Sequence, residues 1–166
     1  MKLEFTKQAM KLSNVNVRSE LHGEEREPAS DLKFEAMVSN DVLSQLDSGL
    51  KGALYHYDSA RPDLADEGKK AEPGFLPHLR FPRLGQEGFK WNDEMAGASV
   101  AILVKGAKKP LELKDVKVNN IKLSPKDGGT VAVSLRVQCH PDEDAFGKLA
   151  TLVQSEVEVT LVPAAE

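Results

Sequence analysis

Alternation of apolar and polar side chains constrains this chain more than any other feature of its sequence. Residues 32–38, 131–139 and 157–161 carry the clearest alternation. Successive side chains of an extended strand point to opposite faces, so each run presents one apolar and one polar face. This is typical of antiparallel sheets with one face toward water. Shorter patterns predict further strands around residues 3–5, 15–17, 100–104 and 116–118. We expect six to eight strands in all.

Two principal helices are expected between the strands. Asn40 and Asp41 precede the first, which carries apolar side chains at Val42, Leu43, Leu46 and Leu50. Pro141 and the acidic residues after it begin the second, which carries Phe146, Leu149, Leu152 and Val153. Polar and acidic residues are favoured at helix starts, and apolar positions three and four apart give one buried face. The predicted fold class is α+β, with both helices packed on one face of a mainly antiparallel β-sheet and burying Leu43, Leu46, Phe146 and Leu149.

The turn signals differ between the two predicted hairpins. Asp127-Gly128-Gly129 favours a tight turn because glycine accepts positive φ. The charged residues 23–27 predict a more extended, solvated connection.

A strand-turn-strand-helix unit appears twice. Residues 12–41 overlay residues 113–142 at a constant offset of 101 without gaps, and the apolar positions of both strands stay in phase. This pattern predicts a structural duplication with a two-fold pseudo-axis. The alternative, that any two hairpin–helix units look alike at this level, stays open.

Length and composition predict one folded domain over residues 1–166. Hydrophobic residues make up 40% of the chain and charged residues 29%, which suits a globular protein. We interpret residues 56–97 as an inserted loop segment between two similar halves, with loop expected over residues 58–73.

Several classes of function find no support in the sequence. Cys139 is the only cysteine, which excludes an internal disulfide and a cysteine-based zinc site, and on a strand its neighbour His140 points to the opposite face. We find no phosphate-binding glycine loop, no serine nucleophile motif and no histidine pair at helical metal spacing. We therefore expect no enzymatic turnover, no catalytic residues, no cofactor and no metal. The first residues contain no apolar signal segment and no stretch is long enough to span a bilayer, so we expect no membrane partner and a cytoplasmic location.

His140 with Asp142, Glu143 and Asp144 is the strongest candidate for an enzymatic or metal site. A histidine at a strand end beside three carboxylates suits a general base or an oxygen-rich metal site. The alternative is that Pro141 and the acids only begin and cap a helix, and we favour it.

The middle segment is the best binding candidate, because it gathers aromatic and basic side chains. They are Phe75, His78, Arg80, Phe81, Arg83, Phe89, Lys90 and Trp91. Bases of a single strand stack on aromatic rings while arginine and lysine hold phosphates. The alternative is that the aromatic residues fold back as a cover over the sheet.

Acidic residues supply a competing hypothesis, since the formal net charge of the chain is -4. Residues 24–27, or a carboxylate row such as Glu156 and Glu158, can face a basic groove of a protein partner. The alternative function is thus a protein-binding inhibitor, for example of a nuclease or a defence complex.

Short stretches along nearly the whole chain resemble one uncharacterised family of bacteriophage and prophage proteins. They are NVRSE at 16–20, HG at 22–23, SND at 39–41, RFP at 80–82, CHPDE at 139–143, GKL at 147–149 and EVEVTL at 156–161. The resemblance implies a phage-encoded accessory protein in the bacterial cytoplasm and supplies no catalytic residues. Within that setting, the middle segment leads us to expect binding to single-stranded nucleic acid or to the replication and recombination machinery that handles it.

Overall fold

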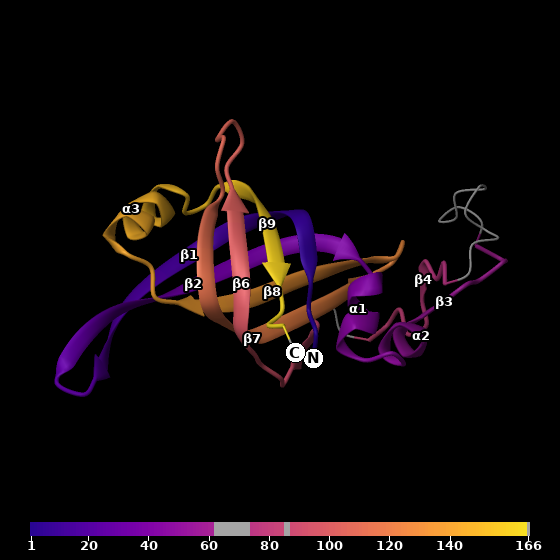
Figure 1. Cartoon of the computed structure of the whole chain (residues 1–166). Helices are drawn as coiled ribbons and strands as arrows, with labels where there is room; N and C mark the ends of the chain where they lie inside the picture. Colours follow the sequence, from indigo (N-terminus) through magenta and orange to yellow (C-terminus); the bar gives the residue numbers. More distant parts are fainter. Residues whose placement is uncertain (62–73, 85–86, 166) are drawn as a thin grey trace.

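The protein is mainly β, a six-stranded antiparallel barrel with short helices (Figure 1). The computed structural model describes residues 1–61, 74–84 and 87–165. The strands are β1 (Phe5–His22), β2 (Glu25–Ser39), β3 (Tyr55–His56), β4 (His78–Leu79), β5 (Phe89–Trp91), β6 (Met95–Leu103), β7 (Leu111–Lys126), β8 (Thr130–Cys139) and β9 (Glu156–Val162). The helices are α1 (Asp41–Leu46), α2 (Leu50–Leu54) and α3 (Glu143–Thr151).

The barrel closes because every one of its strands has two neighbours. Around the barrel the order is β1, β2, β8, β7, β6 and β9, and β9 pairs again with β1. The short β5 pairs with β7 near the end of that strand, and β3 and β4 form a separate two-stranded ribbon. Closure corrects the α+β prediction: the sheet curls around its own apolar face, so helices are not needed to cover that face.

The predicted alternation correctly gives the side chains that fill the barrel. Val133, Leu135 and Val137 of β8 are buried, as are Leu32 and Phe34 of β2. Their neighbours in the sequence point outward. Strand phase is therefore confirmed for both runs, because a shift of one residue would have reversed every side chain.

Two of the predicted strands are parts of one long strand. Residues 3–5 and 15–17 were expected in separate strands, yet β1 runs unbroken from Phe5 to His22. The pairing register of β1 shifts at bulges, and Lys7 takes a positive φ of 45° at one of them. On β7, Asp115 and Asn120 take positive φ of 52° and 51°. Such irregularities increase local twist and let a long strand bend around a barrel.

The helices are shorter than expected, and among the described residues only α3 has seven or more residues. The first predicted helix is broken into α1 and α2, and Asn40 does not cap it, because its side-chain amide donates to the carbonyl of Leu76 (2.8 Å). Leu43 and Leu149 are buried as predicted, whereas Leu46 and Phe146 are only half-buried. No helix in the described ranges is long and apolar enough to cross a membrane.

The β1–β2 hairpin has a tight turn where a longer connection was expected. His22 pairs with Glu25, so only Gly23 and Glu24 form the turn, and Gly23 has φ 68°. A glycine with positive φ at the first turn position is typical of a two-residue hairpin turn. The hairpin projects from the barrel on the side away from α1, α2, β3 and β4 (Figure 1). The turn of the β7–β8 hairpin lies at Asp127-Gly128-Gly129, as predicted.

The inserted segment 56–97 is more structured than the predicted loop, since its described part holds β4, β5 and the start of β6. Residues 62–73, which make up most of the predicted loop at 58–73, lie outside the described residues. Tyr55 fastens the chain before the insertion to the second hairpin. Its buried hydroxyl lies 2.7 Å from the Lys126 carbonyl and 2.9 Å from that of Thr130, and burial raises the pKa of Tyr55 to about 12.

Replacing Tyr55 by phenylalanine tests this attachment. The Tyr55→Phe variant leaves two carbonyl oxygens without their shared donor, so we expect the free energy of unfolding to fall by about 1–3 kcal/mol. Urea unfolding curves measure this loss. Tyr57→Phe, a change at a half-buried tyrosine nearby, is the matched control. Equal curves for the wild type and Tyr55→Phe would contradict the assigned role.

Candidate functional site

The eight residues predicted for binding divide into buried, half-buried and exposed groups. His78 is buried and held in place by two hydrogen bonds: its Nδ1 accepts from the backbone N–H of Asp58, and its Nε2 lies 3.0 Å from the carbonyl of Arg61. These contacts occupy both ring nitrogens. Phe75 is half-buried just before β4, whereas Arg80, Phe81 and Arg83 follow β4 and are exposed.

The remaining three residues of the set form β5 and point in opposite directions. Phe89 and Trp91 are half-buried against the core, opposite Leu123 and Ile121 of β7. Between them Lys90 is exposed on the other side of the strand, opposite Lys122. The structure thus brings Phe89 toward Phe81 and separates both from Lys90.

Phe81, Leu84 and Phe89 line an apolar cavity of about 420 Å³. The other lining residues are Leu54, Leu79, Glu87, Gly88 and Pro125. Phe81 is 57% exposed and Leu84 is 65% exposed. Both side chains belong to one turn, in which the Leu84 N–H donates to the Phe81 carbonyl (3.0 Å). Exposed apolar side chains around a hollow are typical of a binding surface. We call these three side chains and the hollow between them the Phe81 cavity.

Backbone contacts hold the walls of the Phe81 cavity. The backbone N–H of Arg80 donates to the carbonyl of Leu54 (2.9 Å), and its guanidinium donates to the carbonyls of Gly52 and Tyr55. The acceptors of the Arg80 guanidinium are neutral carbonyl groups, which do not cancel its positive charge. At the opposite wall Gly88 has φ 75°, and a Cβ there would lie 2.2 Å from the carbonyl oxygen of Leu123. Only glycine allows this close approach.

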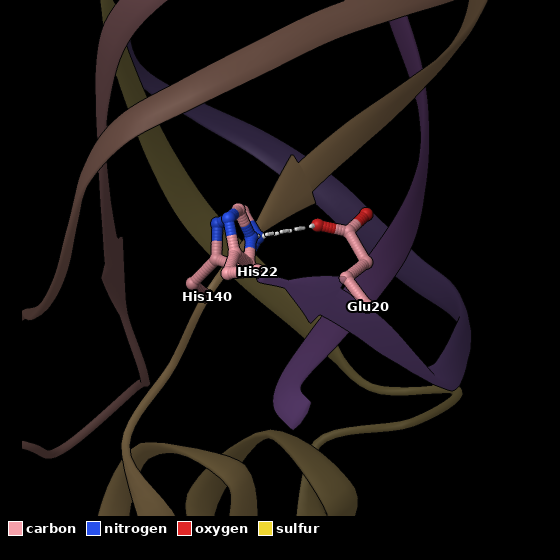
Figure 2. Close-up of side chains that lie close together, drawn as sticks. All are labelled: Glu20, His22 and His140. Atoms are coloured by element: carbon pink, nitrogen blue, oxygen red, sulfur yellow. Dashed lines mark hydrogen bonds and ion pairs between the residues drawn. The ribbon is translucent and has the colours of Figure 1, made fainter. Parts of the chain in front are cut away.

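A second group of chemically active side chains lies near the turn of the projecting hairpin (Figure 2). Glu20 and His22 lie two residues apart on β1, so both point to the outer face of the sheet. His140 follows β8, and its Nε2 lies 2.9 Å from Oε2 of Glu20. We call these three residues the histidine–carboxylate cluster. Their ligand atoms all lie within 4.8 Å of one another.

The acids that follow His140 act as the helix start that we favoured. The carboxylate of Asp142 accepts from the backbone N–H of Ala145 (2.7 Å) and caps α3, while Glu143 and Asp144 lie in its first turn. His140 therefore has its closest carboxylate on β1, far away in the sequence. The spacing Glu20-x-His22 on a strand was a signal that sequence reasoning missed, but no pattern indicated that His140 would join it.

Cys139 is buried, and its thiol lies 3.6 Å from the carbonyl of Ser30. Burial and the nearby carboxylate of Asp31 raise the pKa of the Cys139 thiol to about 12. The thiolate that a nucleophile requires is thus strongly disfavoured.

The acidic surfaces predicted for a protein partner are exposed. Glu24, Glu25 and Glu27 lie at the hairpin tip, and Glu156 and Glu158 lie on the outer side of β9. The same hairpin also exposes two apolar side chains, Val17 (62%) and Leu21 (69%), which the sequence analysis did not single out.

Comparisons with protein-family models, with curated proteins and with solved structures give no match for this chain. The Phe81 cavity and the histidine–carboxylate cluster are therefore interpreted from their own geometry.

The burial of Cys139 predicts an unreactive thiol. At pH 8 the folded protein should not react with an aromatic disulfide reagent during minutes of exposure, because the sulfur is out of reach and protonated. One thiol per chain should react at once in denaturant. Rapid labelling of the folded protein, followed by absorbance, would contradict this assignment.

Proposed function

We propose that this protein is a non-enzymatic binding protein that holds single-stranded nucleic acid at the Phe81 cavity. The exposure of Phe81 at the mouth of an apolar hollow, beside Arg80 and Arg83, carries the proposal. The setting is that of a phage or prophage accessory protein in the bacterial cytoplasm, acting with replication and recombination machinery.

Stacking on Phe81 is the main source of affinity in this proposal. An unpaired base offers a flat apolar face, and one base–aromatic stack contributes about 1–3 kcal/mol. The cavity between Phe81, Leu84 and Phe89 can take the base, whereas a duplex keeps its bases stacked on each other. Single strands are therefore preferred.

Electrostatic attraction adds little, because few charges are available. Arg80 and Arg83 are sequence neighbours of the lining residues Phe81 and Leu84, and Glu87 lines the cavity. Two phosphate contacts on a single strand give a slope of about -1.4 in log K against log salt. The carboxylate of Glu87 can accept a hydrogen bond from an exocyclic amine, which cytosine has and thymine lacks.

Fluorescence anisotropy with labelled oligo(dC) and oligo(dT) tests the proposal. We expect oligo(dC) to bind more tightly, and Phe81→Ala to weaken binding about 5- to 150-fold through the lost stack. Replacing both Arg80 and Arg83 by glutamine should flatten the salt dependence. Leu21→Ala, which changes another exposed apolar side chain on the projecting hairpin, is the control and should leave the affinity unchanged. Absence of binding at low salt, or equal affinity for Phe81→Ala, would refute the proposal.

A protein partner is the second candidate function, and the projecting hairpin favours it. Val17 and Leu21 lie four residues apart on the face of β1 that continues the barrel interior, but no core covers them. Acidic side chains surround the nearby turn. A basic groove with an apolar floor in a nuclease or a defence complex would fit this surface.

Inhibition assays on a candidate nuclease distinguish this second function. Leu21→Ala should weaken inhibition at least about fivefold, since an apolar side chain at the centre of an interface contributes more than about 1 kcal/mol. Phe81→Ala should then leave inhibition unchanged. The opposite pattern assigns the activity to the Phe81 cavity.

We also propose that the two halves arose by duplication, and the pairing order supports this. In the barrel β2 pairs with β8, β1 and β7 flank them, and β9 and β6 complete the ring. Each half thus supplies hairpin, helix and strand in the same order. At offset 101 Phe34 corresponds to Leu135, and these two residues face each other across the β2–β8 pair. The gapless overlay does not hold through the turns, because Gly23 and Glu24 correspond at this offset to Ser124 and Pro125, which lie within β7.

A further inference from the structure

We propose that Glu20, His22 and His140 form a binding site for a divalent transition metal ion, with Zn²⁺ the best fit. Two imidazole nitrogens and one carboxylate oxygen are a familiar three-ligand set for zinc, with a fourth position open to water. The inference is independent of the Phe81 cavity, which lies at the other end of the barrel.

The distances in the cluster suit three ligands arranged around one central ion. Nε2 of His140 lies 2.9 Å from Oε2 of Glu20, but Nε2 of His22 lies 3.7 Å from the same oxygen, too far for a hydrogen bond. In a tetrahedral zinc site with bonds of about 2.0–2.1 Å, neighbouring ligand atoms lie about 3.3–3.4 Å apart. The two observed distances fall on either side of this value. The half-exposed rings of His22 and His140 can make the small adjustment needed.

The charges around the cluster also favour a cation. Glu20 and Glu27 are directly opposite each other in the β1–β2 pairing, and like charges in such pairs are destabilising. Oε2 of Glu27 lies 3.8 Å from Nε2 of His22, on the same side as the cluster. A metal ion between the histidines would offset this repulsion and place Glu27 near its open position.

Arg18 holds the carboxylate in the orientation that a ligand needs. Its guanidinium pairs with Oε1 of Glu20 and, at 3.1 Å, with Oδ1 of Asp31. Oε2 of Glu20 is thereby directed at the histidines. Such outer contacts to a ligating carboxylate are typical of metal sites. The bound ion would join the projecting hairpin to the junction between β8 and α3.

Titration calorimetry with Zn²⁺, and the visible absorption of bound Co²⁺, test the site. We expect one ion per chain and a tetrahedral Co²⁺ spectrum. His22→Ala, His140→Ala and Glu20→Gln should each weaken binding by more than the 10- to 100-fold that is usual for an outer contact. His56→Gln and Glu24→Gln, which change a histidine and a glutamate outside the cluster, should retain full affinity.

Thermal unfolding supplies a readout of structure. Saturating Zn²⁺ should raise the Tm of the wild type and of Glu24→Gln, since an ion that binds only the folded state stabilises it. The Tm of folded His140→Ala should not respond. No binding to the wild type, an octahedral Co²⁺ spectrum, or equal affinity in the cluster variants and the controls would overturn the proposal.

Discussion

The pairing of β9 with both β1 and β6 is the constraint on which the rest of the structure depends. It joins the last strand of the chain to the first, and it leaves no barrel strand with an unpaired edge. The apolar faces of the strands then bury one another in the barrel interior. Helices are therefore not needed to cover an apolar sheet face. They can be short, and they can stand at the ends of the barrel (Figure 1).

Closure also determines where the two surfaces are and what holds them. On the outer face, Arg18, Asp31, Gln138 and Asn119 are linked by successive side-chain contacts across β1, β2, β8 and β7. This row fixes Arg18, and Arg18 in turn orients Glu20. At the other end, Tyr55 ties the chain next to the Phe81 cavity to the second hairpin. The histidine–carboxylate cluster thus lies beside barrel strands, and the Phe81 cavity is attached to the barrel through Tyr55 and through the β5–β7 pairing.

Much of the barrel could be predicted from local pattern, because alternation reports which side chains face the core. It gave the interior of β2, β8 and β9 and the turn at Asp127-Gly128-Gly129. It could not give closure, which depends on pairing between strands far apart in the sequence. Nor could alternation predict the bends of the long strands. Lys7 and Asp115 adopt positive φ there, but neither residue type prefers positive φ strongly enough to predict a bend from the sequence. The candidate site shows the same limit: β1 supplies Glu20 and His22, but only the fold brings His140 to them.

The β1–β2 hairpin extends farther beyond the barrel than the β7–β8 hairpin does. In the second hairpin, Lys126 pairs with Thr130 and the turn follows close to the barrel. In the first, the pairing continues out to His22 and Glu25, past the last core residues. Leu21 gains no core contact there and exposes apolar surface to water, which stabilises nothing in the isolated chain. A barrel of this kind closes without the extra residues. The proposed metal site and the proposed partner surface both use this extension, close to its turn.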